Sequence, residues 1–246
     1  MKRKLWIAAL SLLAAQTAFA QTEASQEIGS GQLAGEKQVS LYRQTDDALP
    51  QVSFNTTGYT LFGVLYVAAA VAKMKSQSSS LQDAYHAYLQ AHPELPTLQQ
   101  AFRNRLDQDL KTAGIEAASF DDVQKESTDK ALIYHFDAAK LNTHKLVVLD
   151  KLDASYFAPS STDPYKPLSR VVVSIYDHDH PEAKPLQFVR VANSAQGDSP
   201  YAFKDYEALS KDIGQAYSGL KASTEMLADE LVRSMTRTDT AAISTP

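Results

Sequence analysis

The chain contains no cysteine, and this absence removes several kinds of protein at once. Disulfide staples, thiolate metal sites and cysteine nucleophiles are excluded, and so is a lipid anchor attached through a cysteine thioether. The sequence also lacks a Gly-x-Ser-x-Gly elbow, and Gly29, Gly31 and Gly35 lack the flanking strand and helix of a phosphate-binding loop. We therefore find no catalytic motif, expect no cofactor and predict a protein that is not an enzyme.

Long apolar runs are also scarce, and the first one is a targeting segment. Lys2, Arg3 and Lys4 precede the short apolar stretch Leu5–Leu13, and Ala18-Phe19-Ala20 fits the small-x-small cleavage rule. The sequence thus predicts a signal peptide over residues 1–20, cleaved after Ala20. The mature protein is then expected to be exported, and to be periplasmic in a Gram-negative cell.

The charge balance is mildly acidic, which makes nucleic acid an unsuitable partner. The formal charge of the whole chain is −5, and loss of the three leader cations takes it to −8. Composition then divides the chain. Residues 21–49 predict a flexible lead-in with Val39–Tyr42 touching the body, residues 50–235 a single domain, and residues 236–246 a disordered tail.

One apolar stretch in the mature chain, Gly58–Met74, could suggest a membrane segment. It is shorter than a typical span, Gly63 interrupts it and Lys73 lies near its end. We expect a helix buried all round in the core and regard membrane contact as the alternative. Gln51–Asn55, just before it, predicts a short strand.

Three further helices are predicted from apolar periodicity. After a polar joint at Ser76–Ser80, a helix capped by Ser80 runs to Pro93, and another begins near Pro96 and ends at Gly114. The charged residues 103–109 of the second are expected to be a solvated face. A long C-terminal helix is predicted from Tyr201 to about Met235.

The strand signals are concentrated between residues 131 and 193. Ala131–Phe136 predicts a strand, with Asp137 capping one helical turn after it. The apolar runs Lys145–Phe157, Arg170–Tyr176 and Leu186–Val191 follow, and the last two predict an antiparallel hairpin because their linker is too short for a crossover. The fold class expected is α/β of the α+β type. Its mixed, partly antiparallel sheet has about four or five strands, with helices mainly on one face.

A metal site is the sharpest chemical alternative, at the turn of this hairpin. On an extended chain His178 and His180 point the same way, while Asp177 and Asp179 share the opposite side. Two imidazoles at this spacing can share one Zn²⁺ or Cu²⁺, although a closed site needs four ligands and a catalytic one about three. Polar residues are also ordinary at a hairpin tip. Asp150 and Asp153 are interpreted as solvated loop groups.

An aromatic and proline-rich connection forms the second candidate site. Tyr156, Phe157, Tyr165 and Pro167 border or belong to the segment between two expected strands. Aromatic residues in such a connection predict either a packed loop or an exposed rim that contacts a partner. Both interpretations stay open at the level of sequence.

The order of these elements resembles a known group of proteins. A helix like Leu98–Ile115, the strand Lys145–Leu152 with Tyr156, the connection Tyr165-Lys166-Pro167, a Val-rich hairpin and a long terminal helix are similar to uncharacterised proteobacterial envelope proteins. More distantly they resemble the curli-secretion and penicillin-binding-protein-activator lipoproteins. The resemblance implies an α/β module that assists an envelope assembly without catalysis. This chain departs from it by lacking the lipid-bearing cysteine. We therefore expect an accessory protein with an envelope protein as partner, of unspecified oligomeric state.

Overall fold

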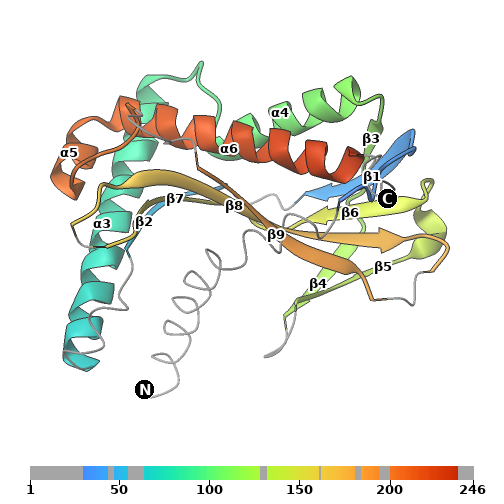
Figure 1. Cartoon of the computed structure of the whole chain (residues 1–246), viewed down its shortest axis with the longest axis horizontal. Helices are drawn as coiled ribbons and strands as arrows, with labels where there is room; N and C mark the ends of the chain where they lie inside the picture. The colour runs from blue at the N-terminus through green and yellow to red at the C-terminus, as the bar shows by residue number, and fades with distance from the viewer. Residues whose placement is uncertain are drawn as a thin grey trace, which may run out of the picture.

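The computed structural model describes residues 30–43, 47–54, 64–127, 132–160, 162–180, 184–193 and 200–237. The predicted signal peptide 1–20, residues 58–63 of the apolar stretch and the tail from residue 238 lie outside these residues. Figure 1 shows helices grouped above a curled sheet, with one helix crossing the side of the sheet.

Strand β8 (Lys166–Asp177) is the longest strand of the sheet and has neighbours on both sides. β9 (Leu186–Asn193) pairs antiparallel with one side, which confirms the predicted hairpin. β6 (Lys145–Leu149) and β7 (Asp153–Ala158) lie end to end along the other side, both antiparallel to β8. β6 is an interior strand, as its two apolar sides predict.

The run Lys145–Phe157 therefore forms two strands joined by a bend. Leu149 faces Val173, whereas Asp153 faces Arg170, so the β6–β7 side carries one residue more than β8 between these pairs. That count is the signature of a β-bulge, which bends a strand and increases its twist. The backbone N–H of Asp150 still donates to the carbonyl of Val172, at 3.0 Å, and keeps the bend attached to β8.

The remaining strands of the sheet run parallel to their neighbours. β1 (Gln38–Arg43) lies between β6 and β3 (Glu116–Ser119), and β2 (Pro50–Phe54) pairs with β7. The sheet is mixed and partly antiparallel, with seven strands rather than four or five. Because β6 and β7 lie end to end, its width at any level is five strands (β9-β8-β6-β1-β3) or four (β9-β8-β7-β2).

Two helices cover one face of this sheet, here called the helix face. α4 (Leu98–Thr112) and α6 (Ile213–Thr236) lie together above it (Figure 1). Ala154, Ser169 and Ala192 are direct cross-strand neighbours on β7, β8 and β9, and all are buried. These small side chains let α6 lie close to the sheet, where the Ser223 hydroxyl donates to the carbonyl of Ala192 at 2.9 Å.

Helix α3 (Val64–Ala91) covers the outer side of β2. The Ser78 hydroxyl accepts from the backbone N–H of Val52 at 2.9 Å, and the Gln82 amide donates to the carbonyl of Pro50 at 3.1 Å. Side chains of the helix thus satisfy backbone groups of β2 that another strand would otherwise pair. α5 (Tyr206–Lys211) is a short helix near the start of α6.

The opposite face carries a second, smaller core under the β6 end of the sheet. β4 (Val123–Ser127) and β5 (Leu132–Phe136) form a separate two-stranded ribbon, followed by the helical turn η2 (Ala138–Lys140). Tyr134 of the ribbon packs with Leu146, Val148 and Tyr176 of the sheet. The predicted strand near residues 131–136 and the cap of the turn by Asp137 are both confirmed.

The N-terminal part of the described chain corrects the predicted lead-in. Residues 30–43, expected to be flexible, form a turn and the interior strand β1. In that turn the backbone N–H groups of Gly31 and Leu33 donate to the carbonyls of Ser234 and Met235, at 2.9 and 2.8 Å. These carbonyls belong to the last turn of α6, whose acceptors have no partner inside the helix. The folded domain therefore begins before residue 50.

The helix boundaries differ from the prediction in three places. α3 continues through Ser76–Ser80, where a joint was expected, and the Ser80 hydroxyl donates back to the carbonyl of Ser76 inside the helix. The long terminal helix is interrupted at Asp212, which separates α5 from α6 and caps α6 through the N–H of Gln215. α4 begins near Pro96 as predicted, but its cap is Thr97, in a capping box, so Pro96 precedes the helix and is not part of its first turn. Its end at Gly114, with a φ of 77°, is as predicted.

The apolar stretch Gly58–Met74 was expected to form a helix buried all round, and its described part does not. Ala70 and Met74 are buried against Phe54 and Ala158, whereas Ala69, Ala72 and Lys73 are exposed. The described part is therefore an ordinary amphipathic helix. None of the helices in the described residues is long and apolar enough to span a membrane.

Two buried tyrosines tie α3 and α6 to the start of α4 and predict a loss of stability in alkali. Tyr85 accepts from the N–H of Leu98 at 3.0 Å, and Tyr217 donates to the carbonyl of Pro96 at 2.7 Å. Burial raises the pKa of each to about 12 from the ordinary 10. The two hydroxyls therefore contribute fully to the free energy of unfolding below pH 10, and this contribution is lost as the pH rises toward 12.

We expect the urea midpoint to fall between pH 10 and 12 and to fall less steeply in Tyr217→Phe, which has one fewer ionisable hydroxyl. Urea titrations at half-unit pH steps measure both slopes. Identical slopes in the two proteins would show that Tyr217 does not contribute.

Candidate functional site

The aromatic and proline-rich segment divides between the two faces of the sheet. Tyr156 lies in β7 and Pro167 in β8, and both are buried on the helix face. The Tyr156 hydroxyl donates to the carbonyl of Ala216 at 3.1 Å, and its ring meets Phe203 edge-on with centroids 5.4 Å apart. Because Tyr156 is 0% exposed, it is a core residue and not part of a surface rim.

Tyr165 is anchored just before β8. Its N–H donates to the carbonyl of Phe203 at 2.7 Å, and the N–H of Phe203 donates back at 2.9 Å. This bridge ties residues 200–203 to the sheet, and the half-buried Tyr165 packs against the main hydrophobic cluster and against the small cluster that contains Phe54 and Ala158. The packed-loop interpretation therefore holds for Tyr156, Tyr165 and Pro167.

Phe157 is the member of the predicted rim that points the other way. In β7 it stands directly opposite Lys166 of β8, so both side chains lie on the face opposite the helices. The same face continues through alternate residues of three strands. We call this surface the open face; it consists of Ser155, Phe157, Lys166, Leu168, Arg170, Val172, Val189 and Val191.

The burial pattern shows how the open face differs from the helix face. All eight residues of the open face are half-buried, whereas their alternate neighbours from Ala154 to Ala192 on the helix face are buried. The apolar residues among the eight belong to none of the hydrophobic clusters formed by the described residues. Among the described residues, the ribbon β4–β5 packs against this side of the sheet beside β6, through Tyr134. The β7–β8–β9 part is thus a partly apolar surface with a helix layer behind it.

The open face also carries charge. Arg170 pairs with Asp153 at 2.6 Å, across the β7–β8 ladder. Lys166 makes no ion pair with any residue that the structure describes. At the border with the ribbon, Lys125 of β4 pairs with Asp150 at 2.7 Å. Asp150 and Asp153 are thus held by separate cations and do not form a carboxylate pair for acid–base chemistry.

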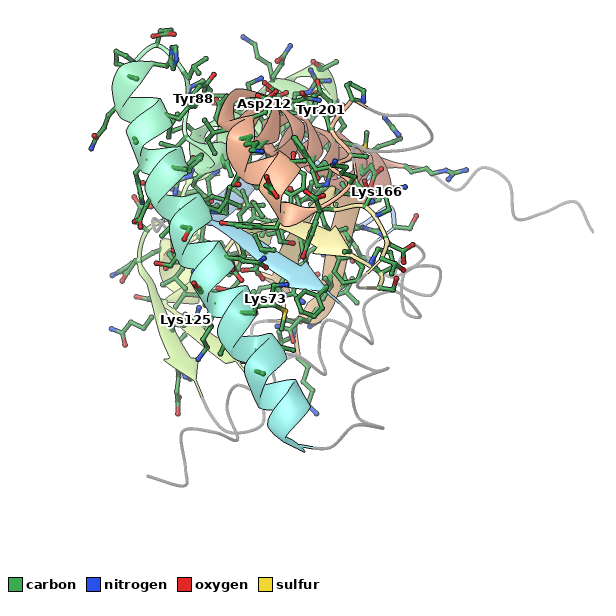
Figure 2. All side chains as sticks on the ribbon, turned by 90° about the vertical axis from the view of Figure 1, so that its left-hand side faces the viewer. Lys73, Tyr88, Lys125, Lys166, Tyr201 and Asp212 are labelled. Atoms are coloured by element: carbon green, nitrogen blue, oxygen red, sulfur yellow. The ribbon has the colours of Figure 1, made fainter. Side chains whose placement is uncertain are left out.

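Figure 2 views the molecule along its α3 side. In this view α3 stands in front, with Lys73 on its lower half and Tyr88 near its upper end, and Lys166 and Lys125 lie on opposite sides of it. Asp212, which caps the start of α6, and Tyr201 are labelled at the top of this view, to the right of Tyr88.

The predicted metal candidates lie at the end of the β8–β9 hairpin as expected. Lys145 donates to Asp177 at 2.5 Å, and this hydrogen bond lowers the pKa of the Asp177 carboxyl. Asp179 lies between two imidazoles, 3.2 Å from Nδ1 of His178 and 3.7 Å from Nδ1 of His144. Hydrogen bonding with His178 lowers the pKa of Asp179. His180 is exposed at the end of the turn.

His144 is the member of this cluster that the sequence analysis missed. The N–H of His178 donates to its carbonyl at 2.8 Å, so the pairing of β6 with β8 places it there. Even so, no group of three His, Asp or Glu side chains in the described residues is arranged to hold a metal ion. The geometry is that of a charged turn stabilised by its own ion pairs.

The charged residues of α4 were predicted to form a solvated face, but several of them make ion pairs with other elements. Arg105 bonds Asp229 of α6 through two nitrogens, one of them at 3.1 Å, and also contacts Asp109 at 3.2 Å. Asp107 pairs with Arg43 of β1. The outward side of α4 is therefore partly used to fix it to α6 and to the sheet.

Comparison with known proteins adds little to this picture. No protein-family model matches the chain, and no curated protein matches its sequence. One similar solved structure is that of a Helicobacter pylori protein described as a homologue of neuraminyllactose-binding hemagglutinin. It is 11% identical, with a TM-score of 0.28 over 80% of this chain and 87% of that chain. A likeness at this level supports no functional conclusion.

Proposed function

We propose that this chain is an exported, non-catalytic accessory protein of the cell envelope, which binds a protein partner through the open face. The observation that carries the proposal is that Leu168, Val172, Val189 and Val191 are only half-buried, whereas their alternate neighbours on the helix face are buried. Antiparallel sheets with one packed face usually present polar residues on the other. Four aliphatic side chains there are typical of a contact surface.

The chemistry of the open face restricts the partner. Aliphatic side chains in the centre favour an apolar contact, and Lys166 at one end adds a positive charge. The partner expected is therefore an envelope protein with an apolar patch bordered by at least one carboxylate. The predicted leader peptide and the resemblance to envelope proteins support the location.

The test places a photo-crosslinking residue at Val172 of the full-length protein in living cells, with a matched position at exposed Gln108 on α4. We expect one main product with an envelope protein at position 172 and none at position 108. In purified form that partner should bind Lys166→Glu at least tenfold more weakly, while Lys111→Glu, on the far end of α4, should bind normally.

Either of two results would reject the proposal. One is equal crosslinking at both positions. The other is a partner that binds Lys166→Glu and Val172→Glu with unchanged affinity, in variants whose circular dichroism spectrum is unchanged. Tyr156 is unsuitable for such a test, because truncating a fully buried ring with a bonded hydroxyl would disrupt the core.

A further inference from the structure

The sheet has three borders, each formed by an edge strand, and two of them are protected against pairing with another chain. At β3 the border strand has only four residues, three of them polar or exposed. At β2 the border is covered by α3, whose Ser78 and Gln82 bind backbone groups of Val52 and Pro50. Short strands and covered borders are two of the ways in which proteins prevent one sheet from pairing with another.

The border at β9 has neither protection. β9 spans Leu186–Asn193, contains no proline or lysine, and keeps one register with β8 from Leu186 to Asn193 without a bulge. Among the residues that the structure describes, no strand pairs with its outer side. Figure 1 shows β9 at the margin of the sheet. A long, regular and apolar border strand is a template for pairing with another chain.

We propose that β9 pairs antiparallel with β9 of a second copy, which joins the two sheets across a two-fold axis. A strand that fits there needs aliphatic residues at alternate positions to extend the open face beside Val189 and Val191. β9 itself has this pattern, so two copies present identical and complementary borders, as a two-fold interface requires.

The side chains also select one register. With Val189 opposite Val189 of the second copy, Phe188 faces Arg190 of the second copy and Gln187 faces Val191 of the second copy. In this register the two Arg190 side chains do not face each other. They would do so if the two-fold axis passed through Arg190 instead of Val189. Within one chain the Arg190 guanidinium already lies 5.2 Å from the Phe188 ring, so the cross-strand contact extends an existing cation–π arrangement.

The absence of cysteine makes the test direct, because any introduced cysteine is the only one in the chain. Mature protein carrying Val189→Cys is compared with Val191→Cys and with Gln108→Cys on α4. We expect mild oxidation to give a disulfide dimer at least tenfold faster at position 189, where the two thiols lie on the axis, than at 191 or 108. Unmodified protein should dimerise with rising concentration in sedimentation, and Val191→Lys should remain monomeric with an unchanged fold.

Three outcomes would overturn the proposal. One is a monomer at all concentrations with equal crosslinking at 189 and 108, and another is faster crosslinking at 191 than at 189, which rejects the register. The third is capture of another protein at 189 without self-crosslinking, which assigns the border to a different partner. The proposed function is tested at Val172 and Lys166 of β8, one strand in from this border, and predicts a product with a different protein and not with a second copy, so the two proposals can fail separately.

Discussion

Replacing Gly219 by alanine should lower the free energy of unfolding by about 1–3 kcal/mol, although alanine favours helix more than glycine does. At this point α6 packs against Tyr156 of β7. A Cβ at position 219 would collide with the Tyr156 hydroxyl and lie 3.0 Å from Cβ of Tyr201. Tyr156 cannot move aside without cost, because it is fully buried and bonded to the carbonyl of Ala216. Urea denaturation of the purified protein measures the loss.

Two companion variants separate the collision from the general effect of alanine. Gly214→Ala lies on the same helix, but its Cβ would meet only the end of the Tyr88 side chain, at 3.3 Å. It should leave stability unchanged or raise it by up to about 1 kcal/mol. Tyr156→Phe, which costs about 1 kcal/mol alone, should cost nothing or recover stability in the Gly219→Ala background. Additive effects of the two changes would contradict the close approach.

Leu33→Ala should destabilise the protein by about 2–5 kcal/mol, a loss expected of a core residue rather than of a lead-in. Leu33 is 1% exposed and belongs to the main hydrophobic cluster, while its N–H binds the carbonyl of Met235. The change leaves a cavity where the first described turn of the chain packs against the end of α6. Thermal and urea unfolding of the purified variant provide the measurement.

The control is the neighbouring Gln32→Ala, which removes an exposed side chain and should change stability by less than about 0.5 kcal/mol. If Leu33→Ala also proved neutral, residues 30–35 would not be part of the folded domain in solution.

Sequence reasoning succeeded where local signals determine local structure. The β8–β9 hairpin, the turn capped by Asp137 and the helix ended by Gly114 each depend on residues within a few positions of one another. It failed where contacts with residues distant in the sequence determine the structure. Ser78 lies inside a helix because α3 packs on β2, and the polar-looking strand β1 is interior because β3 and β6 enclose it.

The candidate site shows the same division in one pair of residues. Tyr156 and Phe157 were both assigned to a possible surface, yet neighbours on a strand point to opposite faces, so only one of them could lie there. The structure buries Tyr156 and places Phe157 on the open face. Both residues lie in the predicted run Lys145–Phe157, so the alternation of a strand was enough to separate them. The approach of His144 to Asp179 could not be foreseen, because it depends on the pairing of β6 with β8.

The contact between the turn at residues 30–35 and the last turn of α6 has a consequence for the order of folding. β1 can take its place only after β3 and β6 have been made, and Leu33 can be buried only after residues 234–235 are present. Such long-range closure makes folding slow compared with the local formation of helices. If the chain is exported from its N-terminus, as we propose, the turn at residues 30–35 cannot reach its place in this fold until residues 234–235 have crossed the membrane.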